Sequence, residues 1–190
     1  MTNIIRSVTC TVCVFALFAA GTLSAGGAAK LAATPGVSSL TYKIVHPMHE
    51  FESVSHDVTC TITVDDSSGT IRTAFFSADV TSFDSGNSNR DSHAMEVVDA
   101  LTYPTVSFKS TNIRTLGTGL SVDGDLEFHG QTHPVSFSAA TSATGDTLAV
   151  AGSTSISMTA FGIDRPSLLL VPVQDTIRIS FQMKFPKGTH

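Results

Sequence analysis

Three histidines and one glutamate are the residues whose types and spacing could hold a metal ion. His46 and His49 are three residues apart, and His93 and Glu96 lie at positions i and i+3 of a predicted helix. Imidazole and carboxylate groups at such spacing are typical metal ligands. A straight strand would point His46 and His49 to opposite faces, and Pro47 makes the local path irregular. We therefore interpret these histidines as surface or capping residues and predict neither a metal site nor a protein cofactor.

The neighbouring pair Arg90-Asp91 has two interpretations. A guanidinium group suits a phosphate, so Arg90 could hold the head group of a ligand. Alternatively, the pair forms an ion pair or cap that fixes a short helix to the rest of the fold, and we favour this second interpretation. The chain has no G-x-S-x-G nucleophile motif and no glycine-rich phosphate loop before a helix. We therefore predict that the protein is not an enzyme.

Alternating apolar residues predict about eight short strands separated by turns. A turn-rich run at 84–89 and a short amphipathic helix interrupt the strands; Ser88 or Asn89 could cap this helix, and Met95, Val98 and Leu101 would lie on or near its apolar face. The pattern indicates an all-β fold with a short helix between two central strands, and it does not separate a barrel from a sandwich. The predicted strands span residues 40–44, 58–64, 71–81, 105–109, 120–128, 135–139, 148–158 and 177–185.

The same alternation predicts which side chains face the interior. Arg178 and Gln182 should face solvent, because they alternate with Ile179 and Phe181 on the last strand. An eight-stranded barrel interior is wide enough either to be filled by side chains or to hold one small ligand, and both alternatives stay open. If a ligand is held, the predicted ligand-binding residues are Val106, Phe108, Leu126, Phe128, Phe137, Ile156, Met158, Ile179 and Phe181.

Composition and the N-terminus limit the class of protein. The chain has 190 residues, of which 42% are hydrophobic and 14% are charged, so it can bury one sizeable core. Its net charge of -5, without any run of Lys or Arg, argues against nucleic-acid binding. Arg6, the apolar run 8–20 and the small residues behind it predict a signal peptide over residues 1–28, with an uncleaved anchor as the alternative. We expect a flexible lead-in at 29–38, a β-barrel domain at 39–186, no transmembrane anchor in the mature chain, and a periplasmic or secreted location.

We expect the three cysteines to lie in different parts of the protein. Cys10 and Cys13 lie in the predicted signal peptide, which leaves Cys60 as the single cysteine of the mature chain. On the strand pattern, Cys60 shares a face with Val58 and Ile62, so we interpret it as a buried, inert thiol. Pairing with another chain is the weaker alternative, and a homodimer stays open.

Several stretches resemble the YceI-like family. They are Asn89-Arg90-Asp91-Ser92-His93, the run 103–110 (YPTVSFKS), the run 122–135 (VDGDLEFHGQTHPV) and Phe161-Gly162-Ile163. The resemblance covers about Tyr42 to Phe185. It implies a lipocalin-like antiparallel β-barrel that binds a polyisoprenoid or another long-chain lipid, without catalysis, in the periplasm. The alternative function is a metal- or haem-linked stress or redox-partner protein that uses His46, His49 and His93, since some relatives are joined to cytochrome-like domains.

Overall fold

The computed structural model describes residues 27–187. The predicted signal peptide, with Cys10 and Cys13, therefore lies outside the described residues except for its last two positions. Within the described part of the chain, no helix is both long enough and apolar enough to cross a bilayer.

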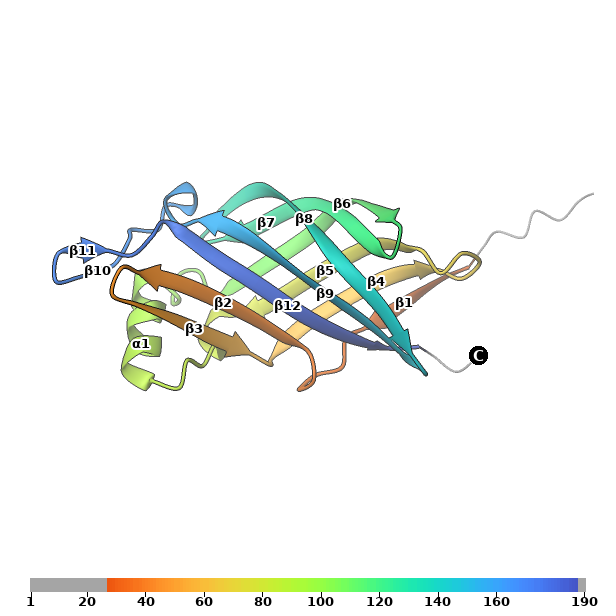
Figure 1. Cartoon of the computed structure of the whole chain (residues 1–190), viewed down its shortest axis with the longest axis horizontal. Helices are drawn as coiled ribbons and strands as arrows, with labels where there is room; N and C mark the ends of the chain where they lie inside the picture. The colour runs from red at the N-terminus through yellow and green to blue at the C-terminus, as the bar shows by residue number, and fades with distance from the viewer. Residues whose placement is uncertain (1–26, 188–190) are drawn as a thin grey trace, which may run out of the picture.

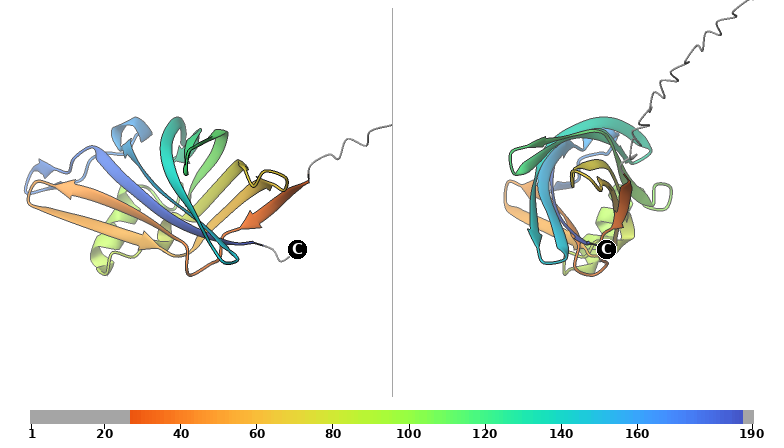
Figure 2. Two further views of the ribbon diagram at one scale, coloured as in Figure 1. Left: turned by 45° about the vertical axis from the view of Figure 1, so that its right-hand side comes forward. Right: turned by 90° about the vertical axis from the view of Figure 1, so that its right-hand side faces the viewer.

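Ten antiparallel strands form one strongly curled sheet, and the helix α1 packs beside it at one end (Figures 1 and 2). The order is β1-β4-β5-β6-β7-β8-β9-β12-β2-β3, so β1 and β3 are the two edges. The strands of this sheet are β1 (Ala28–Ala32), β2 (Ser39–His46), β3 (His49–Ser55), β4 (Val58–Asp65), β5 (Ile71–Asp79), β6 (Thr105–Leu116), β7 (Gly119–Phe128), β8 (Gln131–Thr144), β9 (Thr147–Ser157) and β12 (Thr176–Pro186). The helices are α1 (Ser88–Val97) and two 3-10 turns, η1 (Val80–Ser82) and η2 (Thr159–Phe161). Strands β10 (Ser167–Leu168) and β11 (Val171–Pro172) pair with each other in a small separate hairpin. This arrangement confirms the predicted all-β architecture with one short helix between two central strands.

Both ends of the sheet make backbone contacts beyond the ladder of paired strands. At the β3 edge, the amide of Val54 donates to the carbonyl of Asp84, and the carbonyl of Val54 accepts from the amide of Asp84, both at 3.0 Å. Near the β1 edge, the amide of Thr34 donates to the carbonyl of Lys184 in β12 at 2.7 Å. These contacts satisfy part of the backbone at the edges and bring the two ends of the sheet round a common interior.

The predicted flexible lead-in at 29–38 is a paired strand over residues 29–32. Residues 28–32 form β1 and pair with β4 over five positions, from Ala28 opposite Asp65 to Ala32 opposite Thr61. The composition of this stretch is rich in small residues, which suggested disorder. Pairing with β4 on one side fixes it instead, because part of its backbone amides and carbonyls gain partners that the sequence does not reveal.

Strand β3 was absent from the predicted strands. Its buried side chains include Ser53 and Ser55, neither of which exposes any surface, so the apolar alternation that predicts strands is missing there. The Ser55 hydroxyl lies 2.6 Å from the Ser82 hydroxyl of η1, which explains how one polar residue is accommodated inside. The chain reverses between β2 and β3 through Pro47 and Met48, so the path that Pro47 was expected to make irregular is a two-residue turn.

The ends of α1 also differ from prediction. Asn87 is the N-cap, because its side chain accepts a hydrogen bond from the amide of Arg90 at 3.1 Å, whereas Ser88 and Asn89 are already helical. The helix ends at Val97, and Leu101 is 99% exposed instead of lying on the apolar face. Asp99 adopts a left-handed conformation (φ 46°) directly after the helix, which turns the chain before Leu101 can join that face.

Candidate ligand-binding site

The inside of the curled sheet contains an apolar cavity of about 120 Å³, which we call the inner cavity. Its lining comes from nearly every strand around the sheet, and Thr154 is the only member with a hydroxyl. An engineered protein cavity of about 150 Å³ lined by aliphatic and aromatic groups takes up benzene and stays free of water. The inner cavity therefore suits hydrocarbon and offers almost nothing that could hold water.

A second cavity of about 140 Å³, the outer cavity, lies between the sheet and α1. Met95, Val97 and Val98 contribute the apolar side of the helix, and Phe51 and Phe83 contribute aromatic rings. Four polar side chains also line it, Tyr42, Arg90, Asp91 and His93. Because the side chain of His93 is 64% exposed, the outer cavity approaches the surface beside the helix. It is thus apolar through most of its lining and polar where it meets solvent.

The two cavities adjoin at three shared residues, Leu40, Val106 and Ile179. These come from β2, β6 and β12, which are far apart along the chain; β2 and β12 are paired neighbours, and the curl of the sheet brings β6 to face them. We call this the waist of the site. A long, thin apolar molecule could occupy both cavities only by passing the waist, so these three side chains control the usable length of the site.

The nine predicted ligand-binding residues all line one or both cavities. Val106 and Ile179 line both; Phe108, Leu126, Phe137 and Phe181 line the inner cavity; and Phe128, Ile156 and Met158 line the outer cavity. Arg178 and Gln182 are exposed on the outer surface. Contact of these nine residues with a ligand stays a prediction.

Two of these phenylalanines reach their positions because a neighbouring strand carries glycine. A Cβ atom at Gly152 would lie 2.6 Å from Cζ of Phe181, and one at Gly124 would overlap the ring of Phe108. Each ring therefore approaches a glycine backbone more closely than any other residue at that position would allow. In addition, the Phe137 ring centroid lies 5.4 Å from that of Phe108 and 5.5 Å from that of Phe181. The wall formed by these rings is held by packing within the sheet.

Several lining residues escaped the sequence analysis. Leu40 and Tyr42 lie on a strand that was predicted, and their alternation with Thr41 could have placed them inside. Phe51 lies on β3, which was not predicted, and Pro166 lies in a segment without periodicity. No signal in the sequence identifies these last two, because only the tertiary fold brings them to the cavity.

Arg90 and Asp91 mainly fix the start of α1. Arg90 donates from Nε to the Ser85 hydroxyl at 2.8 Å and from a terminal nitrogen to the Ser85 carbonyl at 2.6 Å. Asp91 accepts from the Ser85 amide at 3.2 Å. The Arg90 guanidinium also lies 5.5 Å from the ring centroid of Phe51, within cation–π range. These contacts match the anchoring interpretation, although both side chains also line the outer cavity.

The histidines do not converge on a metal site. His46 is buried and pairs across the hairpin with His49, with ring centroids 5.2 Å apart. Nδ1 of His46 accepts from the Met48 amide at 3.2 Å, so Nε2 carries the proton and donates to the Val171 carbonyl at 3.0 Å. Nδ1 of His93 lies 3.6 Å from the Glu96 carboxylate instead. Among residues 27–187 there is no group of three or more His, Cys, Asp or Glu side chains placed to bind a metal.

Burial changes the acidity of two lining residues. It raises the pKa of the Cys60 thiol to about 12, so this residue of the inner cavity is a neutral, unreactive thiol at neutral pH. The predicted burial of Cys60 is thereby confirmed. Burial also raises the pKa of Tyr42, which lines the outer cavity and keeps its phenol neutral. The site thus holds no buried charge of its own apart from the Arg90-Asp91 pair at its edge.

Comparisons with known proteins agree with this geometry. The chain resembles the crystal structure of BcnA from Burkholderia cenocepacia with a TM-score of 0.70 and 22% identity, over 77% of this chain and 95% of that one. It also resembles a polyisoprenoid binding domain from Saccharophagus degradans (TM-score 0.65, 10% identity, 83% and 98% covered) and a YCEI protein from Campylobacter jejuni (TM-score 0.61, 15% identity, 70% and 82% covered). At these identities the likeness establishes a shared fold.

Curated sequence relatives match over a shorter stretch. A UPF0312 protein of Vibrio cholerae is 45% identical over 60 residues, which are 30% of this chain, and the match spans only 32% of the relative's length. The model of the YceI-like domain, in contrast, matches residues 32–185, nearly all of the described chain and ten residues earlier than the resemblance seen in the sequence. The chain belongs to the YceI-like domain family.

Proposed function

We propose that this protein binds one long-chain lipid, of the polyisoprenoid class or a similar apolar chain, and carries out no chemistry on it. The observation that carries the proposal is the pair of adjoining cavities with an almost wholly apolar lining. Such a lining favours hydrocarbon, because each buried CH₂ group of a ligand gains about 0.8 kcal/mol on leaving water. The similar domain from Saccharophagus degradans is described as polyisoprenoid binding, which supports the same ligand class here.

The polarity of the site gives the ligand an orientation. The inner cavity can take only an apolar tail, whereas the outer cavity offers the Tyr42 hydroxyl and the edge formed by Arg90 and His93. We therefore place the tail in the inner cavity, the chain across the waist and the polar end beside α1. The ligand's polar group must stay near solvent, since an unpaired polar group in the inner cavity would lose its hydrogen bonds to water.

The side chains around the site support binding without turnover. His46, His56, His129 and His133 bond to backbone groups or to Gln131, and no histidine of the described chain is hydrogen-bonded to a serine hydroxyl or to the Cys60 thiol. Nucleophilic catalysis needs a base within hydrogen-bond reach of the nucleophile. Among residues 27–187, no histidine is paired in this way with a serine or with Cys60.

Native mass spectrometry of the protein purified from its host without detergent tests the binding proposal. We expect a mass excess of one long-chain lipid per chain, released by organic solvent and identified by its fragments. A chain that always carries its bare polypeptide mass, and that takes up no isoprenoid alcohol when one is supplied, would contradict the proposal.

We also propose that the protein is exported. The support is the order of Arg6, the apolar run 8–20 and the small residues that follow. N-terminal sequencing of the exported protein should find a first residue between Gly21 and Lys30. Recovery of the intact Met1 form from the cytosol alone would contradict export without affecting the binding proposal.

A further inference from the structure

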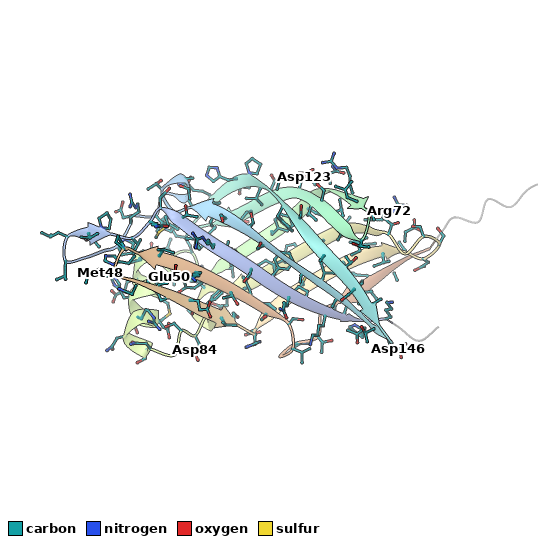
Figure 3. The ribbon with its side chains drawn as sticks, in the orientation of Figure 1. Met48, Glu50, Arg72, Asp84, Asp123 and Asp146 are labelled. Atoms are coloured by element: carbon teal, nitrogen blue, oxygen red, sulfur yellow. The ribbon has the colours of Figure 1, made fainter. Side chains whose placement is uncertain are left out.

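One end of the molecule carries exposed aliphatic side chains on two neighbouring turns. Leu169 and Leu170 form the turn between β10 and β11 and are 74% and 97% exposed, followed by Val171 at 39%. Met48, in the turn between β2 and β3, is 67% exposed. Figure 1 and the left view of Figure 2 place these turns side by side at the same end, and Figure 3 labels Met48 there. We call these four residues the apolar tip.

The backbone at the apolar tip is unusual for leucine. Leu169 and Leu170 both have positive φ values, 52° and 67°, as in a two-residue turn whose central positions normally hold Asn and Gly. A bulky side chain is unfavourable in this conformation and gains no burial here in return. Strain of this kind points to a role outside the folding of the chain itself.

The residue at the base of the same hairpin lies in the wall of the outer cavity. The base of the hairpin is closed by a hydrogen bond from the Val173 amide to the Pro166 carbonyl at 2.9 Å, and Pro166 lines the outer cavity. His46 links the two turns, because its ring bonds to both the Val171 carbonyl and the Met48 amide. The apolar tip is therefore connected directly to the end of the site where we place the ligand's polar group.

We propose that the apolar tip inserts into the surface of a zwitterionic phospholipid bilayer, so that the lipid ligand passes between the bilayer and the outer cavity without crossing water. This inference rests on the proposed function, because only an apolar ligand needs such a route. Transfer of aliphatic side chains from water into hydrocarbon supplies the attraction.

The chemistry of the apolar tip favours a bilayer over a protein partner. It is a narrow protrusion with two aliphatic side chains at its end, whereas protein interfaces are broad patches of about 800 Å² per partner. No charged residue lies among the four, and the chain as a whole carries a net charge of -5, so attraction to an anionic surface is not the source of binding. Binding should accordingly persist at high salt, which screens charges but does not weaken hydrophobic contacts.

The double variant Leu169→Asn with Leu170→Gly tests the proposal, because it supplies the residues that this turn geometry prefers. Folding should be maintained while the aliphatic groups are lost. We expect the unaltered protein to co-sediment with phosphatidylcholine vesicles and the double variant to partition at least about tenfold less. As a matched control, Leu116→Asn removes a leucine that is 64% exposed at the end of β6, on the side of the molecule away from the apolar tip, and should leave partitioning unchanged (Figure 1).

A second measurement separates this inference from the proposed function. Binding of a fluorescent isoprenoid alcohol is measured first in solution and then as extraction from the same vesicles. We expect the double variant to bind the probe in solution like the unaltered protein and to extract it more slowly. Equal vesicle partitioning of both proteins would overturn the membrane inference alone, whereas failure of both to bind the probe in solution would overturn the proposed function. A shift from dimer to monomer in the double variant, seen by light scattering, would assign the apolar tip to a contact between copies and also overturn the inference.

Discussion

Ile179 offers the sharpest test of whether the interior is a ligand site, because it lines both cavities at the waist. In Ile179→Trp the added ring is about the size of benzene, which a cavity of about 150 Å³ can accept. The two cavities measure about 120 and 140 Å³, so the indole can fill much of either one and block the passage between them. We therefore expect the variant to fold and to lose its lipid.

The magnitudes separate this outcome from that of a close-packed core. Inserting a larger side chain into a filled core typically costs about 1–3 kcal/mol. For a domain of this size, each kcal/mol lowers the melting temperature by roughly 2–4 °C. A filled interior therefore predicts a fall of between about 2 and 12 °C, whereas a cavity that receives the indole predicts a change near or below the lower end of that range.

The assay compares melting temperatures of lipid-stripped proteins, because bound lipid would itself stabilise the folded state. Lipid content is measured separately by native mass spectrometry on proteins purified from the host. Ser180→Trp is the matched control: it adds the same indole one residue away, on the exposed face of β12, and should keep its lipid. Unchanged lipid content in Ile179→Trp, or a large loss of stability with no lipid ever found in the unaltered protein, would refute the reasoning.

Four further predictions test separate features. In Gly152→Ala the new Cβ would lie 2.6 Å from the Phe181 ring, so the ring must move toward the inner cavity; chemical denaturation should show a loss of about 1–3 kcal/mol, and lipid content should fall. Hydrogen bonds from Ser67, Arg72 and Ser68 hold the pKa of Asp65 well below its usual range. This lowered pKa stabilises the folded state above the unfolded pKa of about 4, and the stabilisation is lost as the pH falls further. The melting temperature of Asp65→Asn should therefore depend less on pH below about pH 4 than that of the unaltered protein. The thiol of Cys60 should resist iodoacetamide at pH 8 until denaturant is added, as seen by mass mapping of its peptide, because burial raises its pKa to about 12; rapid labelling of the folded protein would contradict its burial. Elemental analysis after dialysis without chelator should find well under one metal ion per chain, and stoichiometric zinc or copper lost in His93→Ala would contradict this.

The sequence by itself determined the fold class and most of the interior. Side chains alternate along a strand whatever the neighbouring strand is, so the period-two pattern of β7, β9 and β12 placed Leu126, Ile156, Ile179 and Phe181 on the inner face. The turn signals and the helix after Gly86 depend on local backbone preferences and were also readable. A family resemblance over four short stretches then indicated the kind of barrel.

Only the tertiary structure decided the rest, since these features depend on partners distant in sequence. Ala28–Ala32 is a strand because β4 lies beside it, and β3 is a strand although Ser53 and Ser55 face inward. Whether the interior is filled or open depends on how far the sheet curls and on glycines such as Gly152 that let rings lie against the wall. Local periodicity predicts neither the curl of the sheet nor the position of the rings. The apolar tip also depends on the tertiary structure. Leu169 and Leu170 look like core residues in the sequence, and only the hairpin that carries them shows that they face outward.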